Sequence, residues 1–268
     1  MITTDAPEAL FRQAMEASAA ALGAPLTPER EHEARLQLHG LLGDLLARRD
    51  MKRDPRLLHM LLACRLRLRA LQNAALCARE EGDFLACPCE LREYTADLCA
   101  AANVLLAPLG RAVRFEAPEE PMECPCAPRD YAWLALELIC NCALHCPGED
   151  IAVSLQPMGT PQPRGKKRAR VFTLTVACEG PLDLAALHAA GLRSGSGVAA
   201  MRRVAWLHHG ALLWLERDGR SVAAFRLGVR NQGPGTRGTG WYDPPDYVDM
   251  LSDPCSQVYV ALAPVTGG

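Results

Sequence analysis

The sequence predicts an α+β protein in which an N-terminal antiparallel helical hairpin is followed by a mixed α/β domain. Two long stretches between residues 28 and 78 carry leucines at spacings of three and four, which is the pattern of amphipathic helices. From Asp83 onward, short runs typical of β-strands alternate with helical runs. The chain has 268 residues, of which 49% are hydrophobic, so it can bury the core of one large domain or two modest ones.

The composition excludes several classes of protein. With 31 acidic and 29 basic residues the net charge is −2, so no overall charge attracts the chain to nucleic acid or to a membrane. The longest apolar runs, Leu98–Leu109 and Tyr131–Leu136, are shorter than the ~20 residues that cross a bilayer. The first 25 residues have neither a basic start nor a cleavage site, so we expect a cytoplasmic protein.

Residues 1–26 are predicted to form an N-terminal helical segment. Its alanine-rich part, Ala6–Leu22, ends at Gly23, a residue type that favours helix ends. Thr27 then supplies an N-cap, and Pro28 suits the first position of the next helix. A second helix is therefore expected to begin near Pro28.

Residues 27–82 are predicted to form the helical hairpin, with Asp54 and Pro55 beginning its second helix and Gly82 following its end. The apolar stripes consist of Leu38, Leu41, Leu42, Leu45 and Leu46 in the first helix and of Leu57, Leu58, Leu61, Leu62, Leu68, Leu71, Ala75 and Leu76 in the second. The arginines expected on the solvent side of the second helix are Arg65, Arg67, Arg69 and Arg79. A lone hairpin leaves part of its stripe uncovered, so we expect two copies to form a dimeric four-helix bundle.

Residues 83–228 are predicted to form the α/β domain. Its predicted helices are Leu91–Leu106, Asp130–His145 and Val198–His208, and its predicted strands are Val113–Phe115, Ile151–Leu155, Val171–Val176, Ala211–Glu216 and Ser221–Leu227. Thr160–Arg170, with its prolines and basic residues, is expected to be an exposed loop between two strands. Residues 229–268 are expected to be a tail rich in proline and glycine with one strand-like segment, Val258–Leu262.

Three polar residues recur four positions apart on the helix predicted over Asp130–His145. Glu137, Asn141 and His145 therefore share one helix face. This E-x-x-x-N-x-x-x-H segment resembles the N-box of the Bergerat-fold (GHKL) ATPases, the superfamily of histidine kinases, gyrase, heat-shock chaperones and MutL. The resemblance implies ATP as the ligand, with Asn141 coordinating Mg²⁺ through its amide oxygen, His145 contacting the nucleotide and Glu137 in a catalytic role.

A second segment extends the resemblance. Gly195 and Gly197 precede a predicted helix that ends in His208, His209 and Gly210, and this order resembles the G2 box and the helix after it. Glycines let backbone amides approach phosphate oxygens at a helix N-terminus. The resemblance therefore implies that Gly195 and Gly197 bind the phosphates.

The segment between these two resembles the G1 box and departs from its pattern. Val176–Leu182 stands at the position of V-x-D-N-G-P-G, so Cys178 and Gly180 are implied to contact the nucleotide. Cys178 replaces the aspartate that accepts a hydrogen bond from adenine, and Leu182 replaces the last glycine. Only fifteen positions separate Gly180 from Gly195, which is short for an ATP lid.

The hairpin occupies the place of the dimerisation and histidine phosphotransfer domain of histidine kinases. The segment beginning at His32 is similar to the H-box HELRTPL, which it matches at its histidine, at Glu33, at its arginine and at its last leucine. The resemblance implies that His32 is the phosphoacceptor and that Glu33 orients it and accepts a proton. His39 and His59 are alternative phosphoacceptors in the same hairpin.

Together these segments identify the chain as resembling a cytosolic sensor histidine kinase. The resemblance implies binding of ATP and Mg²⁺, dimerisation, and phosphotransfer through a histidine to the receiver domain of a response regulator. The alternative keeps the architecture without ATP, as a histidine phosphotransferase or a pseudokinase scaffold, and Cys178 and the short lid favour it. Binding of a partner through an inactive fold is a further alternative.

The chain contains twelve cysteines. Without a signal peptide they are expected to stay reduced, as buried apolar residues and without a disulfide framework. Three C-x-C pairs suggest zinc binding as another class of function, and they are Cys87 with Cys89, Cys124 with Cys126, and Cys140 with Cys142. Structural zinc sites prefer a longer spacing, and the last pair faces two sides of a helix.

Overall fold

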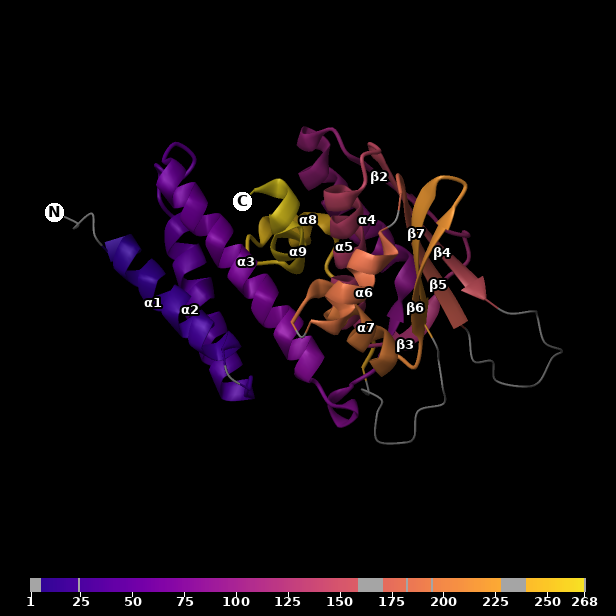
Figure 1. Cartoon of the computed structure of the whole chain (residues 1–268), viewed down its shortest axis with the longest axis horizontal. Coiled ribbons are helices and arrows are strands. Elements are labelled where there is room, and N and C mark those ends of the chain that lie inside the picture. Colours follow the sequence, from indigo (N-terminus) through magenta and orange to yellow (C-terminus); the bar gives the residue numbers. More distant parts are fainter. Residues whose placement is uncertain are drawn as a thin grey trace.

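The computed structural model describes residues 6–23, 25–158, 171–181, 183–193, 195–227 and 240–267, so the predicted loop Thr160–Arg170 lies outside the described residues. The chain begins with three packed helices, shown in indigo to violet in Figure 1. These helices are α1 (Ala6–Leu22), α2 (Pro28–Leu46) and α3 (Pro55–Ala78). The predicted hairpin is α2 and α3.

Local capping begins both hairpin helices where the sequence predicts. The side chain of Thr27 accepts a hydrogen bond from the backbone N–H of Arg30, and Asp54 accepts one from that of Arg56. Helix α1 packs on both α2 and α3 and buries Ala14 on them. Part of the apolar stripe of the hairpin is therefore covered within the chain.

A five-stranded mixed sheet forms the second part of the molecule. Its strands, in spatial order, are β2 (Ala112–Glu116), β4 (Asp150–Met158), β5 (Val171–Glu179), β7 (Arg220–Leu227) and β6 (Ala211–Arg217). Strands β2 and β4 are parallel, and the other neighbours are antiparallel. Side chains alternate between buried and half-buried along β4 and β5, so one face of the sheet carries the core.

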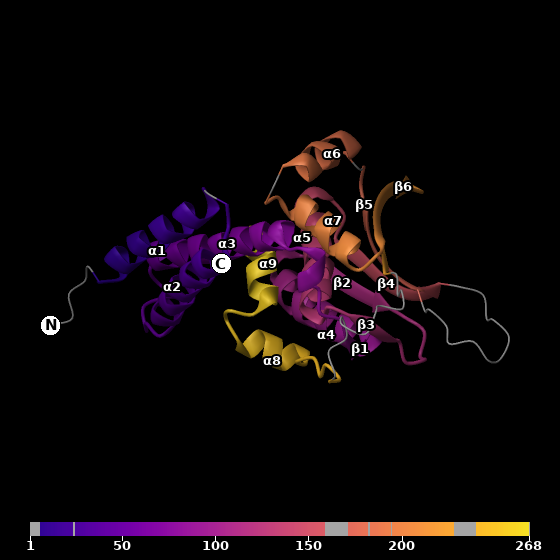
Figure 2. The ribbon, with the colours of Figure 1, turned by 90° about the horizontal axis from the view of Figure 1, so that it is seen from below.

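Three helices cover that face, and Figure 2 shows them between the sheet and α3. They are α4 (Leu91–Leu106), α5 (Pro128–His145) and α7 (Gly197–Leu207). Helix α5 is the centre of the core, because every residue from Tyr131 to Cys140 is buried. The predicted helices and strands of the α/β domain are confirmed, with ends shifted by at most three residues.

Some elements were not expected from the sequence. They are the two-stranded ribbon of β1 (Cys87–Glu90) and β3 (Glu123–Cys126), helix α6 (Leu184–Leu192), and the short 3-10 turns Glu81–Asp83 and Ala107–Leu109. In the ribbon, Pro88 lies opposite Pro125, and a proline inside a short run argues against a strand when only the sequence is read.

The strand predicted at Val258–Leu262 is wrong. The C-terminal part of the chain forms α8 (Tyr247–Ser252) and α9 (Gln257–Thr266), and α9 packs against α3, α4 and α5. A short apolar run cannot be distinguished from a buried helix by its periodicity, and here tertiary packing decides in favour of the helix. None of the described helices is both long and apolar enough to span a membrane.

Candidate functional site

A cavity of about 390 Å³ lies between the end of α5, helix α6 and the adjacent strands β5, β6 and β7. We call it the α5–α6 pocket. The residues that line it include Leu138, Asn141, Cys142, His145, Cys146, Cys178, Leu187, Val198 and Trp214. A concave, mainly apolar cavity with a few polar groups is the usual form of a small-molecule site.

Two N-box residues lie in this pocket. Asn141 and His145 both line it from the last turns of α5. The Nδ2 atom of Asn141 is buried and has no hydrogen-bond partner among the described residues. The imidazole of His145 is exposed. Asn141 and His145 share one face of α5, as their spacing predicts, and both side chains therefore reach the same pocket.

The third N-box residue, Glu137, contacts the hairpin. Its carboxylate is fully buried and accepts two hydrogen bonds from the Arg69 guanidinium, each of 2.7 Å. Burial raises the pKa of Glu137, while the charge of Arg69 acts in the opposite direction. The expectation that Arg65 and Arg69 face solvent is wrong, because the side of α3 that carries them packs on α9, α7 and α5.

Two further polar contacts fix α3 on α5. The indole N–H of Trp133 donates to the Asn73 side chain at 3.0 Å, and Arg79 forms an ion pair with the buried Asp130. Together with the ion pair between Arg69 and Glu137, these contacts form a row between two antiparallel helices. From Arg69 towards Arg79 along α3, the partners on α5 run from Glu137 back to Asp130. The hairpin and the α/β domain are thereby joined by three buried or half-buried polar contacts.

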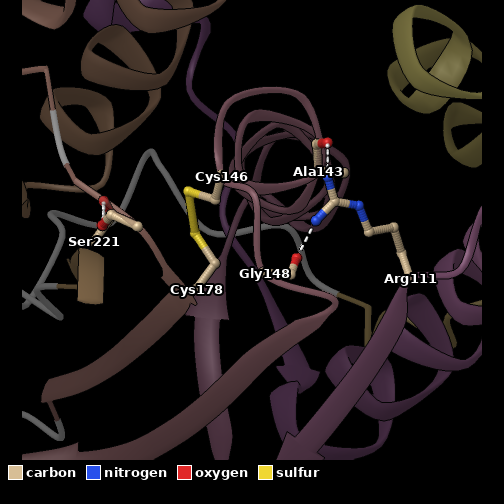
Figure 3. The surroundings of a disulfide bond; sticks show 7 residues. Arg111, Ala143, Cys146, Gly148, Cys178 and Ser221 are labelled. Carbon is tan, nitrogen blue, oxygen red and sulfur yellow. Dashed lines mark hydrogen bonds between the residues drawn. A yellow bond between two sulfur atoms is a disulfide. The ribbon is translucent and has the colours of Figure 1, made fainter. Parts of the chain in front are cut away.

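The structure bonds Cys178 to Cys146, as Figure 3 shows. The expectation that the cysteines form no disulfide is therefore wrong for this pair, because the fold brings the end of β5 against the end of α5. Next to it, Ser221 donates a hydrogen bond of 2.8 Å to the carbonyl oxygen of Gly180. Gly180 has a φ of +125°, and a Cβ there would lie 2.5 Å from Pro147.

The G2 segment borders the pocket through Val198. Gly195 has a φ of +77°, which favours glycine, and the Ser196 hydroxyl caps α7 by accepting from the backbone N–H of Ala199 at 3.1 Å. At Gly197 a Cβ would lie 2.5 Å from Oε2 of Glu137. The absence of a side chain at Gly197 is therefore required by the buried carboxylate beside it.

The residues predicted for phosphotransfer lie elsewhere. His32 and Glu33 are exposed on α2, and no residue of α2 lines the α5–α6 pocket. Among the alternatives, His39 is half-buried, and burial lowers its pKa. His59 is exposed on α3 beside α1. The structure thus separates the predicted phosphoacceptor from the N-box pocket.

No family model and no curated protein matches the sequence. Solved structures do match. The histidine kinase AdeS of Acinetobacter baumannii aligns over 75% of this chain and 98% of its own, with a TM-score of 0.50 at 13% identity. Full-length ShkA in complex with AMPPNP aligns over 76% of this chain and 47% of its own, with a TM-score of 0.52 at 15% identity. The chain has the histidine kinase fold.

Histidine kinase domains generally bind ATP with Mg²⁺, and one polar side chain of the α5–α6 pocket suits such a ligand. The amide of Asn141 offers an unpaired donor and an oxygen that suits Mg²⁺. Cys178 lines the same pocket, and its sulfur, bonded to Cys146, is a weak hydrogen-bond acceptor. In the disulfide-bonded form, Cys178 therefore offers no strong acceptor to the amino group of an adenine.

Three residues that shape this site were missed by the sequence analysis. Cys142 and Cys146 both line the pocket, and their spacing of four residues at the end of a predicted helix was the available signal. Arg69 was missed because nothing local relates it to Glu137, which lies 68 positions further along the chain.

Proposed function

We propose that this protein is a cytoplasmic, histidine-kinase-like signalling protein that binds ATP with Mg²⁺ and passes phosphate through a histidine to a response regulator. The observation that carries the proposal is the buried, unpaired Nδ2 of Asn141 in the α5–α6 pocket. An unsatisfied buried donor costs about 1–3 kcal/mol, so a ligand oxygen that accepts from it is stabilised there.

In this proposal, Asn141 holds Mg²⁺ through its amide oxygen and His145 contacts the nucleotide from the same helix face. The backbone amides at Gly195 and Gly197 orient phosphate oxygens at the start of α7. Cys178 and Gly180 border the base of the nucleotide. Bound ATP supplies the γ-phosphoryl group.

The proposed phosphoacceptor is His32. It is exposed on α2, so a phosphoryl donor and a receiver domain can both reach its ring nitrogens. Glu33, also exposed, accepts the proton that the imidazole loses. The receiving group of the partner is the aspartate of a response-regulator receiver domain, and the acting unit is a homodimer.

Calorimetric titration with Mg²⁺-ATP tests the nucleotide site. We expect saturable binding that Asn141→Ala weakens at least about 10-fold, because the mutation removes the amide that holds Mg²⁺ and leaves the fold intact. Gln156→Ala, an exposed position on β4, is the control and is expected to bind like the wild type. Equal affinity in both variants contradicts the assignment of Asn141.

Incubation with γ-labelled ATP and a receiver domain tests the phosphoacceptor. Acid-labile label is expected on the wild type, on His39→Gln and on His59→Gln, and to be lost in His32→Gln. Because His32 is exposed, its loss is expected to leave the thermal unfolding temperature unchanged. If acid-labile label persists on His32→Gln, His32 is not the phosphoacceptor.

A second candidate is a scaffold or phosphotransferase that does not bind ATP. It would rest on two features: the carboxylate of Glu137 is already paired with Arg69, and Cys178, proposed to lie beside the adenine, is bonded to Cys146. This candidate predicts that calorimetric titration detects no binding at millimolar Mg²⁺-ATP. It also predicts that a phosphorylated receiver domain transfers phosphate to His32. The two results together select this candidate over the kinase.

A further inference from the structure

Three cysteines meet in the α5–α6 pocket. Cys142 lies in the last turn of α5, Cys146 caps that helix four residues later, and Cys178 lies near the end of β5. All three are buried, and their sulfur atoms lie within 4.8 Å of one another. Within the described part of the chain, no other three His, Cys, Asp or Glu side chains bring ligand atoms as close.

The disulfide accounts for only two of these sulfurs. It joins Cys146 to Cys178 (Figure 3) and leaves Cys142 as a free thiol beside them. A disulfide has no need of a third cysteine, whereas three converging sulfurs are a donor set for a thiophilic metal ion. All three also line the cavity, so an ion from solvent has a path to them.

We propose that, when the disulfide is reduced, Cys142, Cys146 and Cys178 bind one Zn²⁺ ion as thiolates. Zn–S bonds of about 2.3 Å place tetrahedral sulfur ligands about 3.8 Å apart, so shifts of about 1 Å convert the observed cluster into a site. Water or a ligand in the pocket takes the fourth position, which is the arrangement of zinc sites that keep an open coordination position.

The charges around the cluster suit this ion. One Zn²⁺ with three thiolates has a net charge of −1. The guanidinium of Arg111 donates to the carbonyl oxygens of Ala143, at 3.3 Å, and of Gly148, on the two sides of Cys146 in the sequence. This cation lies at the C-terminal end of α5, where it offsets both the residual charge of the site and the partial negative charge of the helix end.

Reduction of the disulfide precedes zinc binding. A dithiol reductant breaks the bond between Cys146 and Cys178, gives two electrons and two protons to the two sulfurs, and itself becomes a disulfide. Cys142 enters the conversion as a buried free thiol. Zinc binding then forms three Zn–S bonds and releases three protons to solvent.

Zinc titration of the reduced full chain tests the site. The protein is reduced with a phosphine under nitrogen, freed of reductant, and titrated with Zn²⁺ alone against a chromophoric chelator. One equivalent is expected to bind, and Cys142→Ser is expected to weaken it at least about 100-fold. This measurement needs no nucleotide, so its failure is distinct from failure of the proposed function.

Cys140→Ser is the matched control. Cys140 is buried on the same helix two residues from Cys142, but its sulfur is not part of the cluster. Its substitution is expected to leave zinc affinity unchanged. Equal affinity in Cys142→Ser and the wild type, or an equal loss in both variants, overturns the proposal.

Alkylation of the wild type gives a readout that needs no variant. Zinc is expected to slow alkylation of the three cluster cysteines at least about 10-fold, as followed by peptide mass spectrometry. The half-buried Cys77 and Cys255 are internal references whose rates are expected to stay constant. Protection of the ribbon cysteines in place of the cluster assigns the zinc to the ribbon and overturns the proposal; those cysteines are Cys87, Cys89, Cys124 and Cys126.

Discussion

His208 lies fully inside the protein, where both ring nitrogens have backbone partners. Its Nε2 accepts from the backbone N–H of Ala127 at 3.1 Å, so its Nδ1 carries the proton and donates to the carbonyl oxygen of Val204 at 2.8 Å. The rings of Phe84 and Phe225 contact it edge-on. Burial lowers the pKa of His208 to about 4.

This pKa predicts an acid-sensitive fold. The pKa of His208 is about 4 in the folded protein and 6.5 in the unfolded chain. The stability that neutral His208 contributes is therefore fully present above pH 6.5 and is lost as the pH falls from 6.5 through 4. The loss from this one group is about 3 kcal/mol. Urea unfolding at pH 7 and 4.5 measures most of this loss, about 2.4 kcal/mol. His208→Gln is expected to lose less between these pH values than His188→Gln, an exposed control on α6, and equal losses contradict the prediction.

The buried ion pair of Glu137 predicts a large mutational effect. Glu137→Gln leaves the Arg69 guanidinium without a carboxylate in a site where Glu137 is fully buried, so we expect a loss of about 3 kcal/mol in the free energy of unfolding. Denaturant unfolding measures it. The control is Glu31→Gln, which breaks the half-exposed pair with Arg35 and is expected to cost at most about 0.5 kcal/mol. Similar costs in both variants count against the role of burial.

The positions of individual site residues were only partly predictable from the sequence. The meeting of Asn141 and His145 follows from their spacing on one helix, which is a local property. The bond from Cys178 to Cys146 and the ion pair of Glu137 depend on how distant elements pack, and no local pattern encodes that. The exposed positions of His32 and Glu33 agree with the phosphoacceptor hypothesis without testing it.

At the scale of elements, prediction succeeds where a helix carries its own start signal. Thr27 and Asp54 cap α2 and α3 as their sequences predict. The ribbon of β1 and β3 was missed because each strand has four residues and a central proline. Helix α9 was missed because it contains Pro264 and depends on burial of its apolar side for stability.

Helix α9 is expected to contribute strongly to stability. Leu262 is fully buried where α9 packs against α3, α4 and α5, so Leu262→Ala is expected to cost about 2–5 kcal/mol. Val248→Ala on α8 is the control, because that side chain is 54% exposed, and it is expected to change stability by less than about 0.5 kcal/mol. Thermal and urea unfolding measure both. A cost for Leu262→Ala as small as that of the control shows that α9 is detached in solution.

At the scale of the whole molecule, the first three helices leave an open groove of about 730 Å³ between α1 and α3. Phe11, Met15 and Met60 form its apolar floor. Its charged margin carries both signs and consists of Glu8, Arg12, Glu16 and Arg56. A surface with an apolar floor and charges of both signs is suited to pairing with a copy of itself about a two-fold axis.

The groove predicts the interface of the proposed homodimer. Met15→Glu places a charge on the apolar floor and is expected to shift the protein from dimer to monomer, with at least about a 10-fold weaker association. Light scattering across a dilution series measures the mass. Leu109→Glu changes a 48% exposed side chain in the other part of the molecule and is the control. A wild type that is monomeric at every concentration contradicts the dimer, and a Met15→Glu variant that stays dimeric places the interface elsewhere.

The contact between α3 and the C-terminal residues sets an order of events during synthesis. Arg65 donates to the carbonyl oxygen of Pro254, 189 positions later, and its guanidinium lies 4.5 Å from the centre of the Tyr259 ring. The ribosome completes the hairpin before it makes α9, so the face of α3 that α9 covers stays exposed while the residues between them are synthesised. This part of the fold therefore cannot be completed before α9 has been made, and chaperones can bind the exposed apolar face during that interval.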